Sequence, residues 1–406
     1  MYEQTPVHRA VYGNGEDLLI CGDVQRLPRE IRDKAGQVQC VYLDPPFLTG
    51  KAFHRKRVYG EKGWRRGNPS LSMPGYTDRF RDEKTYLKLL RRMITVSRDL
   101  LRQEGVFYLH LDWRMAGPAR VMCDRIFGKE RFLNEIIWSY ESGGRSKKTF
   151  SRKHDNILLY ARSAGYQFDL KKVPMDRTEN RQNHMARKVD EDGRLYSSIR
   201  SGDKEYRYYD DEPVYPGDVW TDIGFLQQRD PERTGFITQK PLKLLDRLLK
   251  PVTEPGDWVV DLCCGSGTTL AAAERLNCHF AGLEKNEEAV AVSLARLKAD
   301  NLTLICPCGA EPVKLKAEYN PEAGRLHMSG LELSGDPFPT EASSSDLLES
   351  WETGRIEKGV FYSEKRFQRS FQYPALVDTL RLEDGKMPDV MTTDAAGIRR
   401  AYRWRE

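Results

Sequence analysis

The apolar residues 41–43 are followed at once by Asp44-Pro45-Pro46-Phe47. The two prolines cannot extend a sheet, because each fixes φ near about −65° and lacks a backbone N–H. The pattern therefore predicts a buried strand that stops abruptly, at the edge of the sheet where α/β proteins bind ligands. A planar base with an amino group suits this turn, because Asp44 and the Pro45 carbonyl can accept its amine hydrogens while Phe47 stacks on its face. The alternative is a strand-ending turn with a capping Asp. A second motif is needed to choose between these two interpretations.

A second strand–turn–helix pattern lies late in the chain. The expected strand 258–261 leads into a glycine turn and an alanine-rich helix expected at 270–276. Glycines let a ligand approach the backbone, and a helix N-terminus presents N–H donors. Glu284 ends the next expected strand, 23 positions after Asp261, and an acid at about this spacing can bind ribose hydroxyls. No Walker lysine follows the glycines, so a nucleoside triphosphate is disfavoured.

Expected strands and helices alternate along much of the chain, which favours an α/β sheet. Further strands are expected at 18–23, 38–43, 106–111, 135–139, 156–160 and 279–283, and helices at 26–31, 85–101, 115–127 and 241–249. The strands 135–139 and 156–160 are expected to form a hairpin. Asp23, after the first strand, can accept a hydrogen bond from an adenine-like ring; a simple loop Asp is the alternative.

Residues 48–84 are expected to form a long loop. Its segment 51–66 has a net charge of +6, with Phe53, Tyr59 and Trp64 among the basic residues. Basic residues mixed with aromatic ones suit a nucleic-acid strand. A solvated loop without such a role is the alternative.

The alternating pattern is lost over residues 161–235. These residues are mostly polar, with tyrosines at 196, 206, 208, 209 and 215 among them, and 141–210 holds 16 Lys and Arg against 11 Asp and Glu. We interpret this region as an inserted module, with a solvated irregular insertion as the alternative. Residues 301–406 are expected to be a separate accessory or contact module, with plain structural packing as the alternative. A Pro- and Ser-containing linker is expected within this region, at 335–345.

Composition places few limits on function. A hydrophobic content of 39% is not that of a disordered chain, and a net charge of +5 only permits an anionic partner. The first residues do not resemble a signal peptide, and no apolar run approaches membrane-spanning length. The eight cysteines are scattered, so we expect reduced thiols in a cytoplasmic protein. Cys306-Pro307-Cys308 has no second pair at zinc spacing, so no metal is expected.

Three motifs in this order resemble the β-class amino-methyltransferases of DNA. They are Asp44–Phe47, Thr238-Gln239-Lys240-Pro241 and Gly265–Thr269, and 110–114 and 153–156 add family-like pieces. In that class the Asp-Pro-Pro-aromatic motif precedes the S-adenosylmethionine motif, with a target-recognition region between them. The resemblance covers roughly 15–160 and 236–300; it extends to 161–235 by position only and leaves 301–406 uncovered.

The resemblance implies a Rossmann-like α/β methyltransferase fold in circularly permuted order. Its sheet is mostly parallel and twisted, with helices on both faces, an inserted recognition module and a C-terminal accessory region. We expect the catalytic half at 1–140, the target-recognition region at 141–235, the cofactor-binding half at 236–300 and the accessory region at 301–406.

The implied activity is methyl transfer from S-adenosylmethionine to the N6 amine of adenine in double-stranded DNA, by base flipping and direct in-line transfer. The implied catalytic residues are Asp44, Pro45, Pro46 and Phe47. The implied cofactor residues are Asp23, Asp44, Thr238, Gln239, Lys240, Asp261, Cys263, Gly265, Ser266, Gly267, Thr268, Thr269 and Glu284. The DNA contacts are expected at Lys51, Arg55, Lys56, Arg57, Arg145, Lys147 and Lys148. The implied setting is the nucleoid of a prokaryote or phage-infected cell, with a second copy or a restriction-system subunit as partner.

One departure from the family pattern lies at Cys263, where the family usually has a phenylalanine beside the cofactor's adenine. The smaller side chain predicts weaker cofactor binding. The alternatives are N4-cytosine methylation and a degenerate methyltransferase fold that serves as a DNA-binding subunit. Cytosine-C5 methylation is rejected because Pro307-Cys308 lies past the expected core, and protein glutamine methylation prefers Asn where this chain has Asp44.

Overall fold

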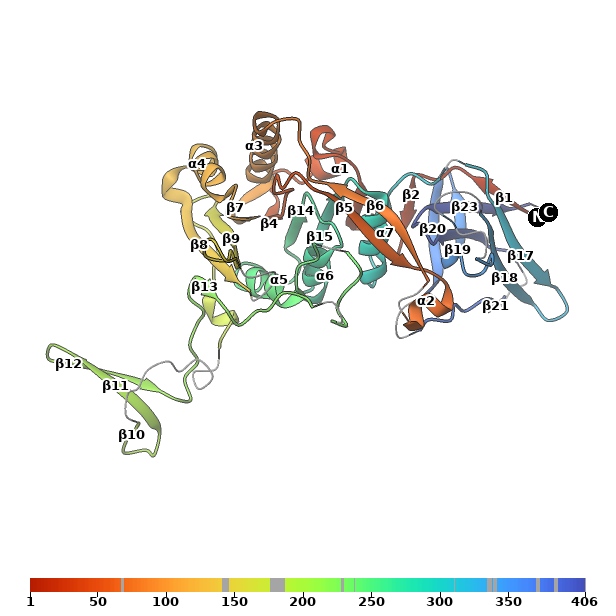
Figure 1. The fold of residues 1–406 in the computed structure, drawn as a ribbon. Coiled ribbons are helices and arrows are strands. Elements are labelled where there is room, and N and C mark those ends of the chain that lie inside the picture. Colours follow the sequence, from red (N-terminus) through yellow and green to blue (C-terminus); the bar gives the residue numbers. More distant parts are fainter. Residues whose placement is uncertain are drawn as a thin grey trace.

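The computed structural model describes residues 1–66, 69–140, 146–175, 187–227, 230–236, 238–309, 311–333, 338, 342–369, 373–382 and 386–405. For 53–57, 64, 66 and 72–77 it describes the backbone only. Figure 1 shows an elongated arrangement: an α/β body lies between a projecting β arm and a β module that holds both chain ends.

Six parallel strands form the centre of the body. They are β3 (Asp17–Cys21), β4 (Val38–Leu43), β7 (Leu101–Leu111), β14 (Trp258–Asp261), β15 (His279–Glu284) and β16 (Leu302–Ile305). Their order across the sheet is β16-β3-β15-β14-β4-β7. The antiparallel hairpin β8 (Phe132–Ser139) and β9 (His154–Ala161) adds through β9 to β7, and β13 (Val219–Trp220) pairs with β8. The expected Rossmann-like sheet is confirmed.

Helices cover both faces of this sheet. The helices α5 (Leu242–Leu249), α6 (Thr268–Arg275) and α7 (Glu287–Arg296) pack on one face, and α1 (Arg29–Arg32), α3 (Glu83–Leu100) and α4 (Ala116–Phe127) pack on the other. Along β4, Cys40 and Tyr42 join the first core while Val41 and Leu43 join the second. This alternation explains why β4 is apolar throughout, since both of its faces are buried. Single turns of 3-10 helix lie at Val24–Arg26, Lys129–Arg131 and Leu170–Lys172.

The ends of α3 and α4 follow directly from sequence. Asp82 caps α3 by accepting a hydrogen bond from the Thr85 N–H at 2.7 Å. Gly128 ends α4 with a φ of +101°, which a residue with a side chain rarely adopts. Among the described residues, no helix is both long and apolar enough to cross a membrane.

The expectation of a long loop over 48–84 is wrong. This segment forms the antiparallel pair β5 (Ala52–Val58) and β6 (Ser70–Thr77), joined across the helix α2 (Gly60–Arg66). Tyr59 and Leu71 at the far end of the hairpin pack with Leu347, Ala395 and Ala396 of the C-terminal region. These side chains pack against residues far later in the chain, so the local pattern could not reveal the hairpin.

The C-terminal region is continuous with the main sheet. It contains β17 (Lys314–Asn320), β18 (Arg325–Glu332), β19 (Leu348–Glu357), β20 (Val360–Gln368), β21 (Thr379–Arg381), β22 (Asp389–Asp394) and β23 (Arg399–Trp404). The N-terminal strands β1 (Tyr2–Thr5) and β2 (Arg9–Val11) join it, since β1 pairs with β23 and β2 lies between β20 and β16. Because β16 also pairs with β3, the expected boundary at 300/301 falls inside the sheet of the body.

The expected insertion 141–235 includes strands of the α/β body as well as the projecting arm. Its strand β9 lies in the main sheet between β7 and β8, so the boundary at 140/141 also falls inside the body. The projecting arm is a separate sheet of β10 (Lys188–Val189), β11 (Leu195–Ser201) and β12 (Lys204–Tyr209), which Figure 1 shows reaching away from the body.

Replacing Leu71 by alanine tests the docking of the hairpin on the C-terminal module. Leu71 is buried, so Leu71→Ala should destabilise the contact by about 2–5 kcal/mol and speed amide exchange over β5 and β6. Hydrogen-exchange mass spectrometry measures this. Leu195→Ala, at an exposed position of the arm, is the control and should leave exchange in the hairpin unchanged. Equal exchange in both variants would show that the hairpin is not held by this contact.

Candidate active site

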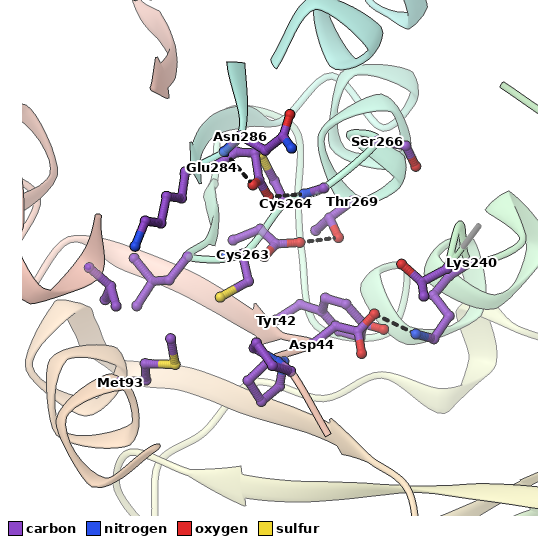
Figure 2. Close-up of a pocket in the computed structure, with 18 of the residues that line it drawn as sticks. Tyr42, Asp44, Met93, Lys240, Cys263, Cys264, Ser266, Thr269, Glu284 and Asn286 are labelled. Atoms are coloured by element: carbon purple, nitrogen blue, oxygen red, sulfur yellow. Dashed lines mark hydrogen bonds and ion pairs between the residues drawn. The ribbon is translucent and has the colours of Figure 1, made fainter. Parts of the chain in front are cut away.

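A cavity of about 510 Å³ opens at the carboxyl edge of the central strands. The segments that follow β3, β4, β14 and β15 all line it, as do the approach to α5 and part of α3. Figure 2 shows Asp44, Lys240, Thr269 and Glu284 around this space. The cavity therefore lies where an open α/β sheet places its ligands.

Nearly all residues implied by the resemblance meet in this cavity. The four residues Asp44–Phe47 line it, together with Asp23, Thr238, Gln239, Lys240, Asp261, Cys263, Gly265, Ser266, Thr268, Thr269 and Glu284. Gly267 is not part of the lining; it lies behind the turn, at the start of α6. Further lining side chains that the sequence did not single out are Val24, Gln25, Arg79, Phe80, Leu89, Met93, Phe236, Lys285 and Asn286.

The glycine turn has little room for side chains. Gly265 and Gly267 have φ values of +50° and +73°. A Cβ at Gly267 would lie 2.8 Å from the Ser293 side chain, and one at Gly265 would lie 3.2 Å from the Phe236 ring. The Ser293 hydroxyl also donates to the Gly265 carbonyl at 2.8 Å. Glycine is thus required here for both backbone conformation and space.

Two carboxylates hold the turn in place. Asp261 accepts hydrogen bonds from the Cys263 N–H at 3.0 Å and the Thr269 hydroxyl at 2.6 Å. Burial, helped by the nearby negative charges of Asp44 and Glu284, raises the pKa of Asp261 to about 7. Glu284 accepts from the Gly265 N–H at 2.9 Å, and burial raises its pKa as well.

An ion pair joins the two halves of the site. Lys240, on the approach to α5, contacts the Oδ2 atom of Asp44 (Figure 2), and both side chains are mostly buried. The Lys240 ammonium also lies 5.3 Å from the centre of the Phe47 ring. The Lys240 carbonyl accepts from the Thr268 hydroxyl at 3.2 Å, which ties this segment to the start of α6.

A buried polar network supports Phe47. Its ring stacks on His110, with ring centres 6.2 Å apart and planes at 22°. His110 is bonded to the Tyr42 hydroxyl at 2.8 Å and to Asp155 at 3.1 Å, and Tyr140 donates to Asp155 at 2.9 Å. Burial acts to raise the pKa of Asp155, but the hydrogen bond and charge of His110 outweigh it and the pKa falls below its usual value. Asp155 is therefore ionised near neutral pH and holds His110 in position.

Asp78 fixes the chain as it leaves the Asp-Pro-Pro-Phe turn. Its fully buried carboxylate accepts from the N–H groups of Leu48 and Thr49, both at 2.9 Å, and from the Thr49 hydroxyl at 2.6 Å. Leu48 has a φ of +58°, which is unusual for a residue with a branched side chain. Asp78 has no local sequence signal, because nothing near it in the chain marks it as the partner of residues 29 and 30 positions earlier.

Glu232 and Arg296 hold the segment around Lys240 in place. Glu232 accepts from the Leu242 N–H at 2.9 Å and forms an ion pair with Arg296 at 3.2 Å. Arg296 also donates to the Thr268 hydroxyl at 2.7 Å. The Gln239 amide donates to the Glu232 carbonyl at 2.8 Å, so this predicted cofactor residue is part of the same support.

Cys263 points into the cavity on the side of Met93 (Figure 2). Burial raises the pKa of this thiol, so it stays protonated near neutral pH and is not a nucleophile. Leu89 and Met93 of α3 line the same cavity and supply apolar surface beside it.

The structure describes the side chains of only some of the residues expected to contact DNA. Lys51, Lys147 and Lys148 are exposed. The side chains of Arg55, Lys56 and Arg57, and all of Arg145, lie outside the described residues. In the part of the chain that the structure describes, no three His, Cys, Asp or Glu side chains gather as metal ligands.

The raised pKa of Asp261 predicts a pH-dependent effect of Asp261→Asn. The pKa of Asp261 is about 4 in the unfolded chain and about 7 in the folded chain. Between these pH values the folded chain binds a proton that the unfolded chain has released, so this group lowers the free energy of unfolding as pH rises. The asparagine variant lacks this loss. Its stability relative to wild type should rise from pH 4 to 7 by a few kcal/mol, at about 1.4 kcal/mol per pKa unit, and then stay constant.

Urea unfolding of both proteins at several pH values measures this difference. Asparagine can still accept from Cys263 and donate to Thr269, so the turn is kept in the variant. Parallel stability curves between pH 4 and 7 would contradict the account of Asp261.

Comparison with known proteins agrees with this geometry. Residues 38–295 match the model of an N6/N4 DNA methylase family. The chain is 25% identical over 297 residues to the type II methyltransferase M.EcaI of Enterobacter cloacae, covering 62% of each chain. It is 24% identical over 292 residues to the DNA adenine methyltransferase YhdJ of Escherichia coli K12, covering 70% of this chain and 84% of YhdJ. The match to M.EcaI thus spans just under two thirds of that protein.

Solved structures also align with this chain. The M1.HpyAVI complex with S-adenosylmethionine aligns with a TM-score of 0.42 and 15% identity over 69% of this chain and 99% of that one. The cytosine-N4-specific PvuII DNA methyltransferase aligns with a TM-score of 0.45 and 14% identity over 73% and 92%. Because the family model covers more than half of the chain, this protein belongs to the N6/N4 DNA methylase family, which depends on S-adenosylmethionine.

Proposed function

We propose that this chain methylates the exocyclic N6 amine of adenine in double-stranded DNA. The observation that carries the proposal is that the Asp44–Phe47 turn and the 263–269 glycine turn line one cavity. The first offers acceptors for an amine, and the second offers the groups that hold a nucleoside-like cofactor. The name of YhdJ, a DNA adenine methyltransferase, supports adenine as the base.

The lining fits S-adenosylmethionine in size and charge. A volume of about 510 Å³ lies within the usual range for small-molecule sites. The carboxylates of Asp23, Asp44, Asp261 and Glu284 suit a ligand that carries cationic groups and ribose hydroxyls. When bound, the cofactor supplies an electrophilic methyl group. Glu284 would hold the ribose, Lys240 the cofactor's carboxylate, and Asp23 the adenine edge.

Asp44 and the Pro45 carbonyl act on the amine of the base. Lys240 contacts Oδ2 of Asp44, so Oδ1 is available to accept an amine hydrogen. Two acceptors on the amine hydrogens orient the nitrogen lone pair and increase its electron density. The proton that the nitrogen loses as it is methylated can pass to the Asp44 carboxylate beside it.

Phe47 positions the ring of the base. Its own orientation is fixed by His110, which Tyr42 and Asp155 hold in the core. A fixed ring reduces the freedom that an incoming base loses on binding, so the network raises the rate by placement. No covalent intermediate between base and enzyme is required.

Asp44→Ala tests the proposal. Methyl transfer should fall by roughly 100-fold or more, because the amine loses its charged acceptor. The melting temperature should stay within a few degrees, because Lys240 borders a cavity open to water and can be solvated there. The assay follows transfer of a radiolabelled methyl group to unmethylated genomic DNA. Asp33→Ala, at an exposed carboxylate directly after α1, is the control and should transfer at the wild-type rate.

Two results would contradict the proposal. One is the absence of transfer by the wild-type protein when S-adenosylmethionine is bound. The other is transfer by Asp44→Ala at the wild-type rate.

A further inference from the structure

An exposed tryptophan lies at the same sheet edge as the active site. Strand β7 pairs in parallel with β4, Leu109 opposite Leu43, so the turn after β7 is next to the turn that holds Asp44. Trp113 lies in this turn, three positions after His110, which contacts Phe47. Its side chain is 43% exposed, although indole is costly to leave in water.

The turn that presents Trp113 is held firmly. Asp112 is mostly buried, and its carboxylate accepts from the Arg114 N–H at 3.0 Å and forms an ion pair with the Arg114 guanidinium. The Asp112 carbonyl accepts from the N–H groups of Met115 and Ala116 at 3.3 and 3.2 Å. Trp113 is therefore exposed on a fixed turn, so its position is preorganised for a ligand.

Two guanidinium groups flank the indole. The Arg152 guanidinium carbon lies 3.8 Å from the centre of the Trp113 ring, and that of Arg114 lies 5.2 Å away. Arg152 comes from the loop between β8 and β9, which reaches this edge because Asn156 of β9 pairs with Leu111 of β7. Such cation–π contacts hold the arginines close to the ring. Arg114 uses part of its guanidinium for the ion pair with Asp112, and the remaining N–H donors of the two arginines can reach other acceptors.

The same loop extends the basic surface. Residues 146–154 contain four Lys and Arg residues and no acid, and Phe150 among them is 99% exposed. The Ser146 hydroxyl accepts from the N–H groups of Lys148 and Thr149 at 3.3 and 3.1 Å, and Ser151 accepts from the Ser146 N–H at 2.9 Å. Residues 146–151 thus have a defined shape, with Lys147, Lys148 and Phe150 exposed to solvent.

We propose that Trp113 stacks on a nucleobase of the DNA strand beside the flipped nucleotide, while Arg114 and Arg152 contact the flanking phosphates. This inference rests on the proposed function. Flipping the target removes a stacking partner from its neighbours in the duplex, and an indole beside the active site replaces it. Stacking on an aromatic ring strengthens single-strand binding for any base.

DNA fits this surface better than a protein does. The core of a protein interface is depleted of charged residues, whereas this indole is flanked by two guanidinium groups. A nucleic acid satisfies both features at once, because its bases offer flat faces and its phosphates offer negative charge.

The test compares four variants with wild type on sheared, unmethylated genomic DNA, by binding isotherms at several salt concentrations. Trp113→Ala should weaken binding about tenfold or more at every salt concentration, with an unchanged salt slope, because stacking releases no counterions. Trp113→Phe should bind almost as well as wild type. Arg152→Ala should weaken binding and reduce the salt slope by about 0.9. Tyr166→Ala is the control and should bind as wild type does. Tyr166 is an exposed aromatic residue near the amino end of β7, away from the active site.

Fluorescence adds a readout independent of affinity. Adding DNA should quench a component of the tryptophan emission that is missing from Trp113→Phe, because stacking brings the indole against a base. This measurement decides the question even if Trp113→Ala folds poorly.

The outcomes separate this inference from the proposed function. Wild-type DNA affinity in Trp113→Ala, or equal quenching in Trp113→Phe, would overturn the role of Trp113 while leaving methyl transfer intact. A change in oligomeric state at unchanged DNA affinity would assign the surface to a second copy and also overturn it. A wild-type protein that binds S-adenosylmethionine but transfers no methyl group would instead refute the proposed function.

Discussion

The parallel pairing of β4 with β14 is the constraint on which the site depends. Asp261 lies opposite Tyr42 in this pair, so the turns after the two strands meet although they are more than 200 positions apart in the chain. The ion pair between Asp44 and Lys240 then closes the gap between the two turns. A slip in this register would turn side chains to the other face of the sheet and separate the amine acceptors from the cofactor groups.

Support for the site comes from buried polar groups that do not themselves line the cavity. His110 and Asp155 fix Phe47 from below, and Asp78 fixes the chain that follows it. Asp78 also ends the hairpin β5–β6, whose far end packs on the C-terminal module. The C-terminal region is thus linked through the hairpin to the turn at the active site, which gives this otherwise unassigned part of the chain a structural role.

Sequence reasoning succeeded where the signal was local. The strand at 38–43 and the helix at 242–249 follow from apolar patterns that each segment contains in itself, and the structure shows both. The glycine turn follows from its glycines between an apolar strand and an alanine-rich helix, and the positive φ values of Gly265 and Gly267 show why glycine is required there. The hairpin at 52–77 has no such local signal, because Leu71 packs with residues far along the chain. Trp113 was noted as part of a family-like segment, but its exposure between two arginines required the fold.

Identifying the methylated nucleoside tests the central claim most directly. The protein is incubated with unmethylated DNA and S-adenosylmethionine that carries a deuterated methyl group, and the digested nucleosides are analysed by mass spectrometry. The account predicts deuterated N6-methyldeoxyadenosine as the product. Label on N4 of deoxycytidine would keep the amine chemistry at Asp44 but contradict adenine as the target, and label on carbon 5 of cytosine, or none in DNA, would contradict the account of the site itself.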